Sequence, residues 1–564
     1  MRNEPRLPNA YLPVLVKGVE RLLKHYGPDK CPGFEPTGDH RTWYPILPFA
    51  LLYTKDVEGN PLRSDERLRG LIERTGRAML ASFNDPELID PATWWYEGRR
   101  VHEWHIEHWL AAFVLLREAG HESMIADWTE PLEVAGRTFN RFCAQIEHLK
   151  RLTSANLKIS TNHFSYFAAD LIRLGQVFDV PAHVERGLDV AMKILDHQHP
   201  DGYWPETHGP TVAYNLVTAG AVGLYHQYTG KEVFRESLRR AVDFQQRYMY
   251  PDGRNVATLD QRVRWRQAPQ YFPSFALSRW PAGRGLAELT FAEQETRLLS
   301  EPRPDELGRI ATDYLYYETG PIETPLCCHG STHYRLSDLP GGVVQRDGWF
   351  TALCGIPSRH REHHYTLDRQ NLLSVYHNDT GIILGGGNSR DTPEIATFYA
   401  KILRDPQSLV DKQTHDVVYL PVAADLAIHE RGASLDLEYW GFDARLEIEI
   451  VDRQCCRVRA FAGTLPINDP ILFNPNIMVD AEQPLRTGTG AELALGNGSE
   501  LDLTAGDVGG AIGQGRWRIE IPEHAKLRYP VQPFSYTKMF MASPLLVVSV
   551  PITNREALLT VRVG

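Results

Sequence analysis

The sequence predicts a multidomain α+β protein, in which an N-terminal (α/α) toroid of helical hairpins precedes an antiparallel β-sandwich. Residues 10–315 read as consecutive amphipathic helices with short breaks rich in Gly, Pro and Asp. Two similar turns, Pro200-Asp201-Gly202 and Pro251-Asp252-Gly253, lie about 50 residues apart, the period of an array of α-hairpins. Beyond residue 340, alternating and β-branched runs separated by turn signals are typical of a sandwich. We therefore expect a toroid over 1–340 and a sandwich over 341–564.

The helical periodicity predicts individual helices over 11–25, 41–54, 64–84, 100–119, 129–148, 162–177, 182–197, 212–228, 232–249 and 286–299. Alternation predicts strands over 349–354, 371–376, 381–384, 416–420, 435–440, 445–450, 457–461 and 545–550. Leu339-Pro340-Gly341-Gly342 reads as the linker between the two domains. A closed ring of hairpins would place its loops at one rim around a cleft.

Bulk composition excludes several classes of protein. The 564 residues are too many for one core, and no apolar run is long enough to span a bilayer. The net charge of -11 argues against a nucleic-acid partner. The start, Met1-Arg2-Asn3, lacks the apolar run of a secretory signal, so we expect a cytoplasmic protein, or a periplasmic or secreted one if a leader has been removed.

Cysteine usage points to reduced, buried thiols. The chain has 7 cysteines, two pairs of them adjacent in sequence, and no CxxC spacing. An odd number with this pattern is not that of a disulfide framework, and the spacing does not suit a structural zinc site.

Two polar segments could carry chemistry. Thr161-Asn162-His163 stands at a predicted helix start, and Tyr214 follows a Gly- and Pro-rich loop about fifty residues later. An amide and an imidazole can donate to a carboxylate as charge develops on it, and a phenol can protonate a leaving oxygen. These are the groups needed to remove a proton from the carbon beside a carboxylate. The structural alternative is that Asn162 is a helix N-cap and His163 an ordinary buried polar residue.

Residues around these segments could bind a sugar. Aromatic rings in and near the breaks, Trp204 among them, suit the C–H faces of sugars, although any one ring could equally fill the core. Arginines near the second turn could pair with uronate carboxylates, although surface salt bridges would also explain them. The candidate substrate-binding residues are His105, Trp204, Glu206, His208, Arg254 and Arg262.

The histidines of His102-Glu103-Trp104-His105-Ile106-Glu107-His108 allow a second interpretation. Their spacing permits a zinc pair on a helix, but it differs from the HExxH pattern of metalloproteases. A cleft wall that contacts sugar hydroxyls, or plain structure, explains them as well. We therefore predict no metal at the catalytic residues.

The Asn162-His163 pair, with Tyr214 behind its Gly-rich loop, resembles the heparinase II/III and oligoalginate lyase group of polysaccharide lyases. The segment from Asn371 to His377, continuing to Gly385-Gly386-Gly387, resembles the first strands of that group's sandwich. The resemblance implies a toroid followed by a sandwich, and β-elimination on an acidic polysaccharide or oligosaccharide. It implies that Asn162 neutralises the substrate carboxylate, that His163 assists or acts as the base, and that Tyr214 is the acid.

The resemblance also implies a further histidine near the domain junction. We prefer His364, and the other candidates are His329, His360, His363 and His377. The chemistry requires no cofactor, although scattered His and Asp residues leave room for a structural divalent metal in the sandwich. The motifs specify no oligomeric state.

Two other functions fit the same scaffold. A six-hairpin glycoside hydrolase would need two carboxylates across the cleft, and Glu97, Glu103, Asp201 and Glu206 are available. A uronate epimerase or a non-catalytic sugar-binding protein is the third candidate.

Overall fold

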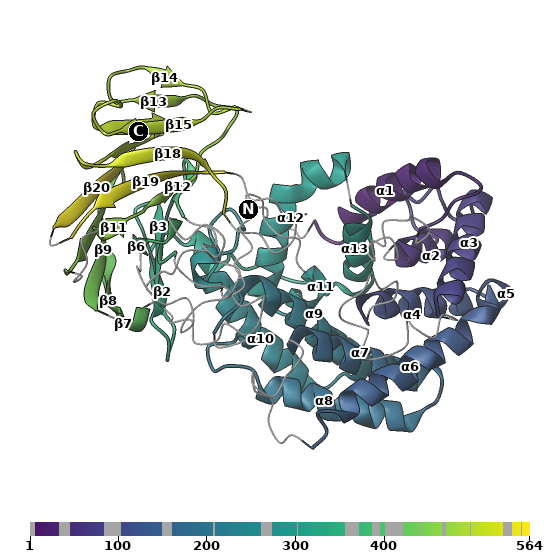
Figure 1. Cartoon of the computed structure of the whole chain (residues 1–564). Helices are drawn as coiled ribbons and strands as arrows, with labels where there is room; N and C mark the ends of the chain where they lie inside the picture. The colour runs from purple at the N-terminus through teal and green to yellow at the C-terminus, as the bar shows by residue number, and fades with distance from the viewer. Residues whose placement is uncertain are drawn as a thin grey trace. The chain divides into compact units, whose positions relative to one another are not determined.

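The computed structural model of the chain describes residues 6–32, 45–83, 103–148, 161–206, 209–260, 273–301, 303–355, 371–385, 395–400, 421–439, 441–464, 470–496, 498–533, 544–553 and 555–564. The chain forms two compact units. The first comprises residues 1–205, 214–243 and 271–324, and the second comprises residues 206–213, 244–270 and 325–564. Helices make up the first unit and strands most of the second (Figure 1).

The helices follow the predicted order along the chain. They are α1 (Tyr11–Tyr26), α2 (Ile46–Thr54), α3 (Glu66–Phe83), α4 (Glu103–Glu118), α5 (Glu122–Ile125), α6 (Thr129–Ala144), α7 (Thr161–Val177), α8 (Pro181–Asp196), α9 (Val212–Thr229), α10 (Glu232–Arg247), α11 (Ser274–Leu277), α12 (Pro281–Ser300) and α13 (Pro304–Tyr316), with short 3-10 turns η3 (Ala126–Trp128), η4 (Ala257–Leu259) and η5 (Leu326–Cys328).

The helical unit closes on itself as a ring. Along one side α13 packs on α2, α2 on α4, and α4 on α7, while α1 packs on both α12 and α13. The first helix is held there by Tyr11, whose ring meets the Phe291 ring edge-on at 5.1 Å. Arg6, just before it, bonds Glu295 of α12 at 2.8 Å. Contact between the first helix and the last two confirms the predicted toroid.

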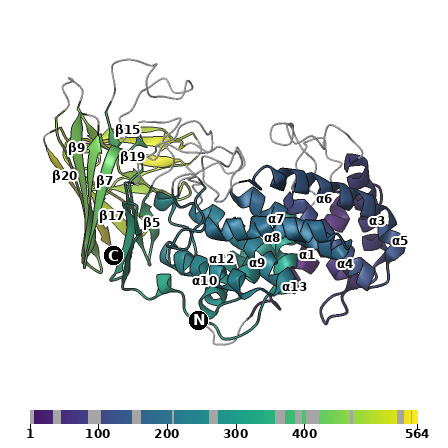
Figure 2. The ribbon, with the colours of Figure 1, turned by 90° about the horizontal axis from the view of Figure 1, so that it is seen from below.

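The α7–α8 pair shows how the hairpins pack. The two helices lie side by side (Figure 2) and are joined by the short turn after Val177. A Cβ at Gly187 would lie 2.8 Å from the carbonyl oxygen of Ala168 on the opposite helix. Only glycine allows this approach, and it brings the apolar faces of both helices into one core.

The strands lie in the second unit. They are β1 (Thr332–Arg335), β2 (Gly341–Arg346), β3 (Trp349–Cys354), β4 (Leu373–His377), β5 (Gly381–Leu384), β6 (Phe398–Tyr399), β7 (Pro421–His429), β8 (Gly432–Tyr439), β9 (Phe442–Asp452), β10 (Cys455–Ala462), β11 (Leu472–Phe473), β12 (Asn476–Ile477), β13 (Leu485–Thr487), β14 (Glu492–Leu493), β15 (Leu501–Thr504), β16 (Ala511–Gln514), β17 (Trp517–Glu520), β18 (Lys526–Val531), β19 (Leu545–Pro551) and β20 (Glu556–Val563).

These strands form two antiparallel sheets within the described residues. One sheet has the order β1-β2-β3-β4-β5-β12-β19-β11-β6, with β18 also paired to β19 and β15 to β18; the other has the order β14-β13-β16-β17-β20-β10-β9-β8-β7. Side chains of β9 alternate between buried and exposed, as expected when one face of a sheet covers a core. Leu426 and Ile428 of β7 lie against Gly342 of β2 in the other sheet. The predicted β-sandwich is therefore confirmed.

The segment expected to be a linker differs from its prediction. Gly341 and Gly342 begin strand β2, which pairs with β1, so strands start before residue 340. Gly342 is required for packing, because a Cβ there would lie 2.7 Å from the carbonyl oxygen of Tyr334. Glycine in a strand can mark close packing rather than a chain break. The segment that resembles the first strands of a sandwich forms β4 and β5, after three earlier strands.

None of the seven cysteines forms a disulfide, and all but Cys328 are buried. Among the described residues, no helix has the length and apolar character needed to cross a bilayer.

Candidate active site

Helices α7 and α9 are parallel neighbours. At one level, a Cβ on Gly220 would lie 2.8 Å from the Tyr166 hydroxyl. Further along both helices, the Arg173 guanidinium lies over the Tyr228 ring, 5.1 Å from its centroid. The contacts advance in the same direction on both helices, so the two N-terminal ends lie at the same end of the helical unit.

One loop ties these two helix starts together. Thr161, the first residue of α7, donates its hydroxyl to the carbonyl oxygen of Pro205 at 3.1 Å. The amide of Trp204, the preceding loop residue, donates to the side-chain oxygen of Asn215 in the first turn of α9 at 3.1 Å. Asn162 and Tyr214 are the immediate neighbours of Thr161 and Asn215. The structure therefore brings the predicted amide and phenol to one rim.

Both side chains are largely withdrawn from solvent. Asn162 is fully buried and Tyr214 is 6% exposed. The backbone carbonyl of Asn162 accepts a hydrogen bond from the Ser165 hydroxyl at 2.6 Å, which places Asn162 inside the first turn of α7. An N-cap stands before the first helical residue, and Thr161 already occupies that first position. The position of the helix start therefore argues against the interpretation of Asn162 as an N-cap.

His163 is held by α4. Its Nδ1 is hydrogen-bonded to Oε1 of Glu103, the first residue of α4, and the Glu103 side chain is completely buried. The Trp104 ring stacks on the imidazole, with 5.2 Å between centroids and 13° between planes. The start of α4 thus lies at the same rim as the starts of α7 and α9. Sequence reasoning noted Glu103 only as a hydrolase candidate and missed this contact, which follows from parallel neighbouring helices beginning at one end of the ring.

Two more carboxyl groups lie deeper in the ring. Burial raises the pKa of Glu107 to about 8, although the charge of Arg173 and a hydrogen bond with Thr312 oppose the rise. Burial, together with repulsion from Glu107 and Glu103, raises the pKa of Asp170 well above its usual range. At neutral pH Glu107 is therefore mainly protonated and uncharged, and burial disfavours the charged form of Asp170 as well.

The described histidines of α4 lie inside the helical unit. His105 and His108 are both buried. His108 Nδ1 is hydrogen-bonded to the carbonyl of Trp104 at 2.7 Å, and burial lowers the pKa of His108 to about 4. A neutral ring whose Nδ1 donates to its own helix leaves only Nε2 for any other partner. His102 lies outside the described residues.

The loop residue Trp204 belongs to the hydrophobic core. Its side chain is 1% exposed and its indole N–H donates to the carbonyl of Ile194 at 2.9 Å. In the same loop, the Tyr203 ring stacks on His199 with 4.4 Å between centroids. Asp201 is paired with His199 at 3.4 Å. These residues shape the loop that ties α7 to α9, and Trp204 presents no open face to a sugar.

The other candidate binding residues lie in the second unit or outside the described residues. Arg254, in the second unit, is paired with Asp252 at 2.5 Å in the tight turn that contains both. Glu206 also belongs to the second unit and is buried. The candidates that lie outside the described residues are His208, Arg262, His364, His360, His363 and Glu97.

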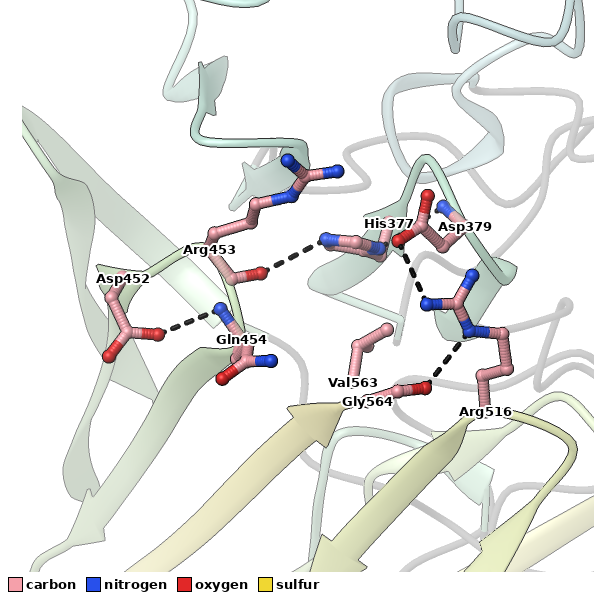
Figure 3. Close-up of a pocket in the computed structure, with 8 residues that line it drawn as sticks. All are labelled: His377, Asp379, Asp452, Arg453, Gln454, Arg516, Val563 and Gly564. Carbon is pink, nitrogen blue, oxygen red and sulfur yellow. Dashed lines mark hydrogen bonds and ion pairs between the residues drawn. The ribbon is translucent and has the colours of Figure 1, made fainter.

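Two junction histidines can be placed. His329 follows η5 and is exposed. His377, at the end of β4, lines a sandwich cavity of about 460 Å³ together with Arg453, Asp379 and Arg516 (Figure 3).

Both ring nitrogens of His377 are engaged by the backbone. Its Nε2 lies 3.1 Å from the carbonyl oxygen of Arg453, and its Nδ1 accepts from the amide of Asp379 at 3.1 Å. Burial lowers the pKa of His377. These bonds fix a neutral ring as part of the turn after β4, which does not suit a catalytic base.

No family model matches the chain, and no curated protein matches its sequence. Solved structures do match. A heparinase III is similar over 97% of this chain and 83% of its own, with 12% identity and a TM-score of 0.50. A heparan sulfate lyase from Pedobacter heparinus matches over 98% of this chain and 83% of its own (11% identity, TM-score 0.49). A chondroitin AC lyase from Streptomyces coelicolor matches over 100% of this chain and 81% of its own (13% identity, TM-score 0.48). The chain therefore shares the fold of heparinase III, a helical toroid followed by an antiparallel β-sandwich.

Proposed function

We propose that the protein is a polysaccharide lyase that cleaves a uronic-acid-containing polysaccharide or oligosaccharide by β-elimination. The observation that carries the proposal is the gathering of Asn162, His163 and Tyr214 at one rim, through the loop that bonds both Thr161 and Asn215. The fold shared with heparinase III supports the same conclusion.

The reaction needs a base, an acid and stabilisation of a carboxylate. A base removes the proton from the carbon that bears the carboxylate, and the electron pair moves into the substrate as a dianionic enolate. That pair then forms a C=C bond as the bond from the β-carbon to the glycosidic oxygen breaks. The acid protonates the departing oxygen, so no water is consumed. Removing such a proton is difficult because negative charge accumulates beside an existing carboxylate.

The rim supplies that stabilisation. Asn162 can donate its amide hydrogens to the carboxylate as charge develops. The starts of α4, α7 and α9 also direct the positive ends of three helix dipoles toward this rim. A uronate carboxylate is the part of an acidic glycan that these groups fit.

Proton transfer then falls to two side chains. His163 serves as the base or assists it, and Tyr214 donates the proton to the departing oxygen. His364 stays a further candidate from the family resemblance. We propose His105, Glu206, His208, Arg254 and Arg262 as residues that bind sugar, and no cofactor or metal takes part in the proton transfers.

A substrate screen tests the function. The purified protein is incubated separately with alginate, glucuronan, hyaluronan, heparan sulfate and ulvan, and near-ultraviolet absorbance and new reducing ends are measured together. A lyase produces both, because each cut leaves an unsaturated uronate. A hydrolase produces reducing ends without absorbance, and a binding protein produces neither; either result would overturn the proposal.

Matched variants link activity to the rim. Tyr214→Phe should remove the absorbance signal. Tyr228→Phe changes the same residue type further along α9 at a partly buried site, where the hydroxyl meets Tyr316. We expect Tyr228→Phe to retain activity. An equal loss of lyase activity in both variants would show that the hydroxyl of Tyr214 has no catalytic role beyond that of another tyrosine on α9.

A further inference from the structure

We propose that Glu103 is a positioning residue that fixes the orientation and tautomer of His163, so that His163 exchanges protons with the substrate through Nε2. This inference rests on the proposed function, because it assigns the substrate-facing proton transfer to the imidazole. It adds a residue from a third helix, α4, to a site otherwise built on α7 and α9.

Three restraints hold the imidazole in place. Glu103 Oε1 is hydrogen-bonded to Nδ1, and the carboxyl group that makes this bond is wholly buried. The Trp104 ring covers one face of the imidazole at a nearly parallel angle of 13°. The His163 side chain is only 12% exposed. A ring that is bonded at one nitrogen and stacked on one face has little freedom to turn.

The bond to Glu103 determines which nitrogen carries the proton. A carboxylate is an acceptor only, so Nδ1 must be the donor of this hydrogen bond. A neutral His163 therefore has its lone pair at Nε2, where a base would accept the substrate proton. A carboxylate that orients a histidine in this way also stabilises the imidazolium formed when that proton arrives.

The charges around Glu103 support a role as the ionised partner. Burial raises the pKa of the neighbouring carboxyl groups of Glu107 and Asp170, so a negative charge is disfavoured on both. A buried carboxylate is costly unless it is paired and hydrogen-bonded. His163 offers Glu103 that pairing, and repulsion from Glu103 is one cause of the raised pKa of Asp170.

Kinetics test the proposal first. Glu103→Gln keeps the size of the side chain but can present its NH2 group to Nδ1, which would move the proton to Nε2. We expect kcat to fall about 10²–10⁴-fold with KM changed only a few-fold. The matched control is Glu107→Gln, one turn along α4, which replaces a group that is already mainly uncharged; it should retain wild-type kcat at pH 7. Wild-type kcat in Glu103→Gln would overturn the proposal.

A double variant separates positioning from structural support. If Glu103 acts only through His163, Glu103→Gln/His163→Ala should have the same kcat as His163→Ala, within a few-fold. A merely structural residue would slow the reaction by the same factor whether or not His163 is present. Multiplied losses in the double variant would therefore contradict the assignment.

The tautomer itself can be observed without substrate. In protein labelled with ¹⁵N-histidine, the His163 signals are assigned by their loss in His163→Gln. We expect a protonated Nδ1 in the wild-type protein and a shift toward protonated Nε2 in Glu103→Gln. An unchanged pattern would overturn the inference about Glu103. Absence of lyase activity in the wild-type protein would instead overturn the proposed function, so the two failures are distinguishable.

Discussion

Replacing Glu107 with Gln should change how the stability of the helical unit depends on pH. Glu107 lies on α4, is 3% exposed, and has a pKa raised from 4.5 to about 8, chiefly by burial. Below pH 4.5 the group is protonated in both the folded and the unfolded state, so its contribution to stability is complete. As the pH rises from 4.5 to about 8, the unfolded state releases the proton while the folded state keeps it. Stability is therefore lost over that window and levels off above it.

The magnitude follows from the size of the shift. At 1.36 kcal/mol per unit of pKa, the rise from 4.5 to about 8 corresponds to about 5 kcal/mol in total, of which about 3 kcal/mol is lost by pH 7. Gln carries no titrating proton and escapes this loss. The free energy of unfolding of Glu107→Gln, measured relative to wild type, should therefore increase by about 3 kcal/mol between pH 4.5 and pH 7.

Urea unfolding followed by far-ultraviolet circular dichroism at a series of pH values measures this difference. The helical transition is the relevant one, because the chain has two units and need not unfold in a single step. Glu118→Gln, at the exposed end of the same helix, is the matched control and should show no such trend. Parallel stability profiles for wild type and Glu107→Gln would refute the reasoning, because they would mean that burial does not hold the proton on Glu107.

Four further outcomes are expected. Tyr214→Phe should abolish turnover with little change in substrate affinity measured by calorimetry; retained kcat would remove Tyr214 from proton transfer. Asn162→Ala should raise the barrier by about 2.7–4 kcal/mol, as loss of one oxyanion donor does, and a loss of kcat below tenfold would limit Asn162 to a role at the helix start. Trp204→Phe should lower the free energy of unfolding by about 1–3 kcal/mol while KM stays constant, because the buried Ile194 carbonyl loses the hydrogen bond from the indole N–H. A raised KM with unchanged stability would show that Trp204 contacts sugar. Dialysis against EDTA should leave kcat unchanged, because the proposed proton transfers use side chains alone; a loss of kcat that added metal restores would contradict a metal-free mechanism.

The layout of the chain was predictable because helices and sandwich strands leave periodic patterns. The predicted helix 162–177 is α7 to within one residue, and the predicted strand 349–354 is β3. Local sequence patterns gave the wrong secondary structure where tertiary packing determines it. Gly341 and Gly342 read as a chain break, but they begin a strand whose backbone approaches its neighbour closely. Helix α13 was missed because Pro304 follows another break, although proline at the first turn is compatible with a helix.

The candidate site was only partly predictable. Asn162, His163 and Tyr214 stand out as polar residues at helix starts, and parallel helices in a ring bring such starts together. The contact between Glu103 and His163 joins residues sixty positions apart, and it depends on which helices become neighbours. Trp204 looked like a sugar platform because aromatic side chains serve both purposes, and only its burial shows that it packs in the core.

The mass of the cleavage products tests the central claim most directly. Elimination at the rim formed by Asn162, His163 and Tyr214 adds no water, so the fragment carrying the new non-reducing end should be one water lighter than the corresponding hydrolysis product. Mass spectrometry of a uronate oligosaccharide digested by the wild-type protein should show that dehydrated fragment, and Tyr214→Phe should yield none. If the fragments that carry the new non-reducing end are fully hydrated, or if Tyr214→Phe forms dehydrated fragments equally well, the account is contradicted.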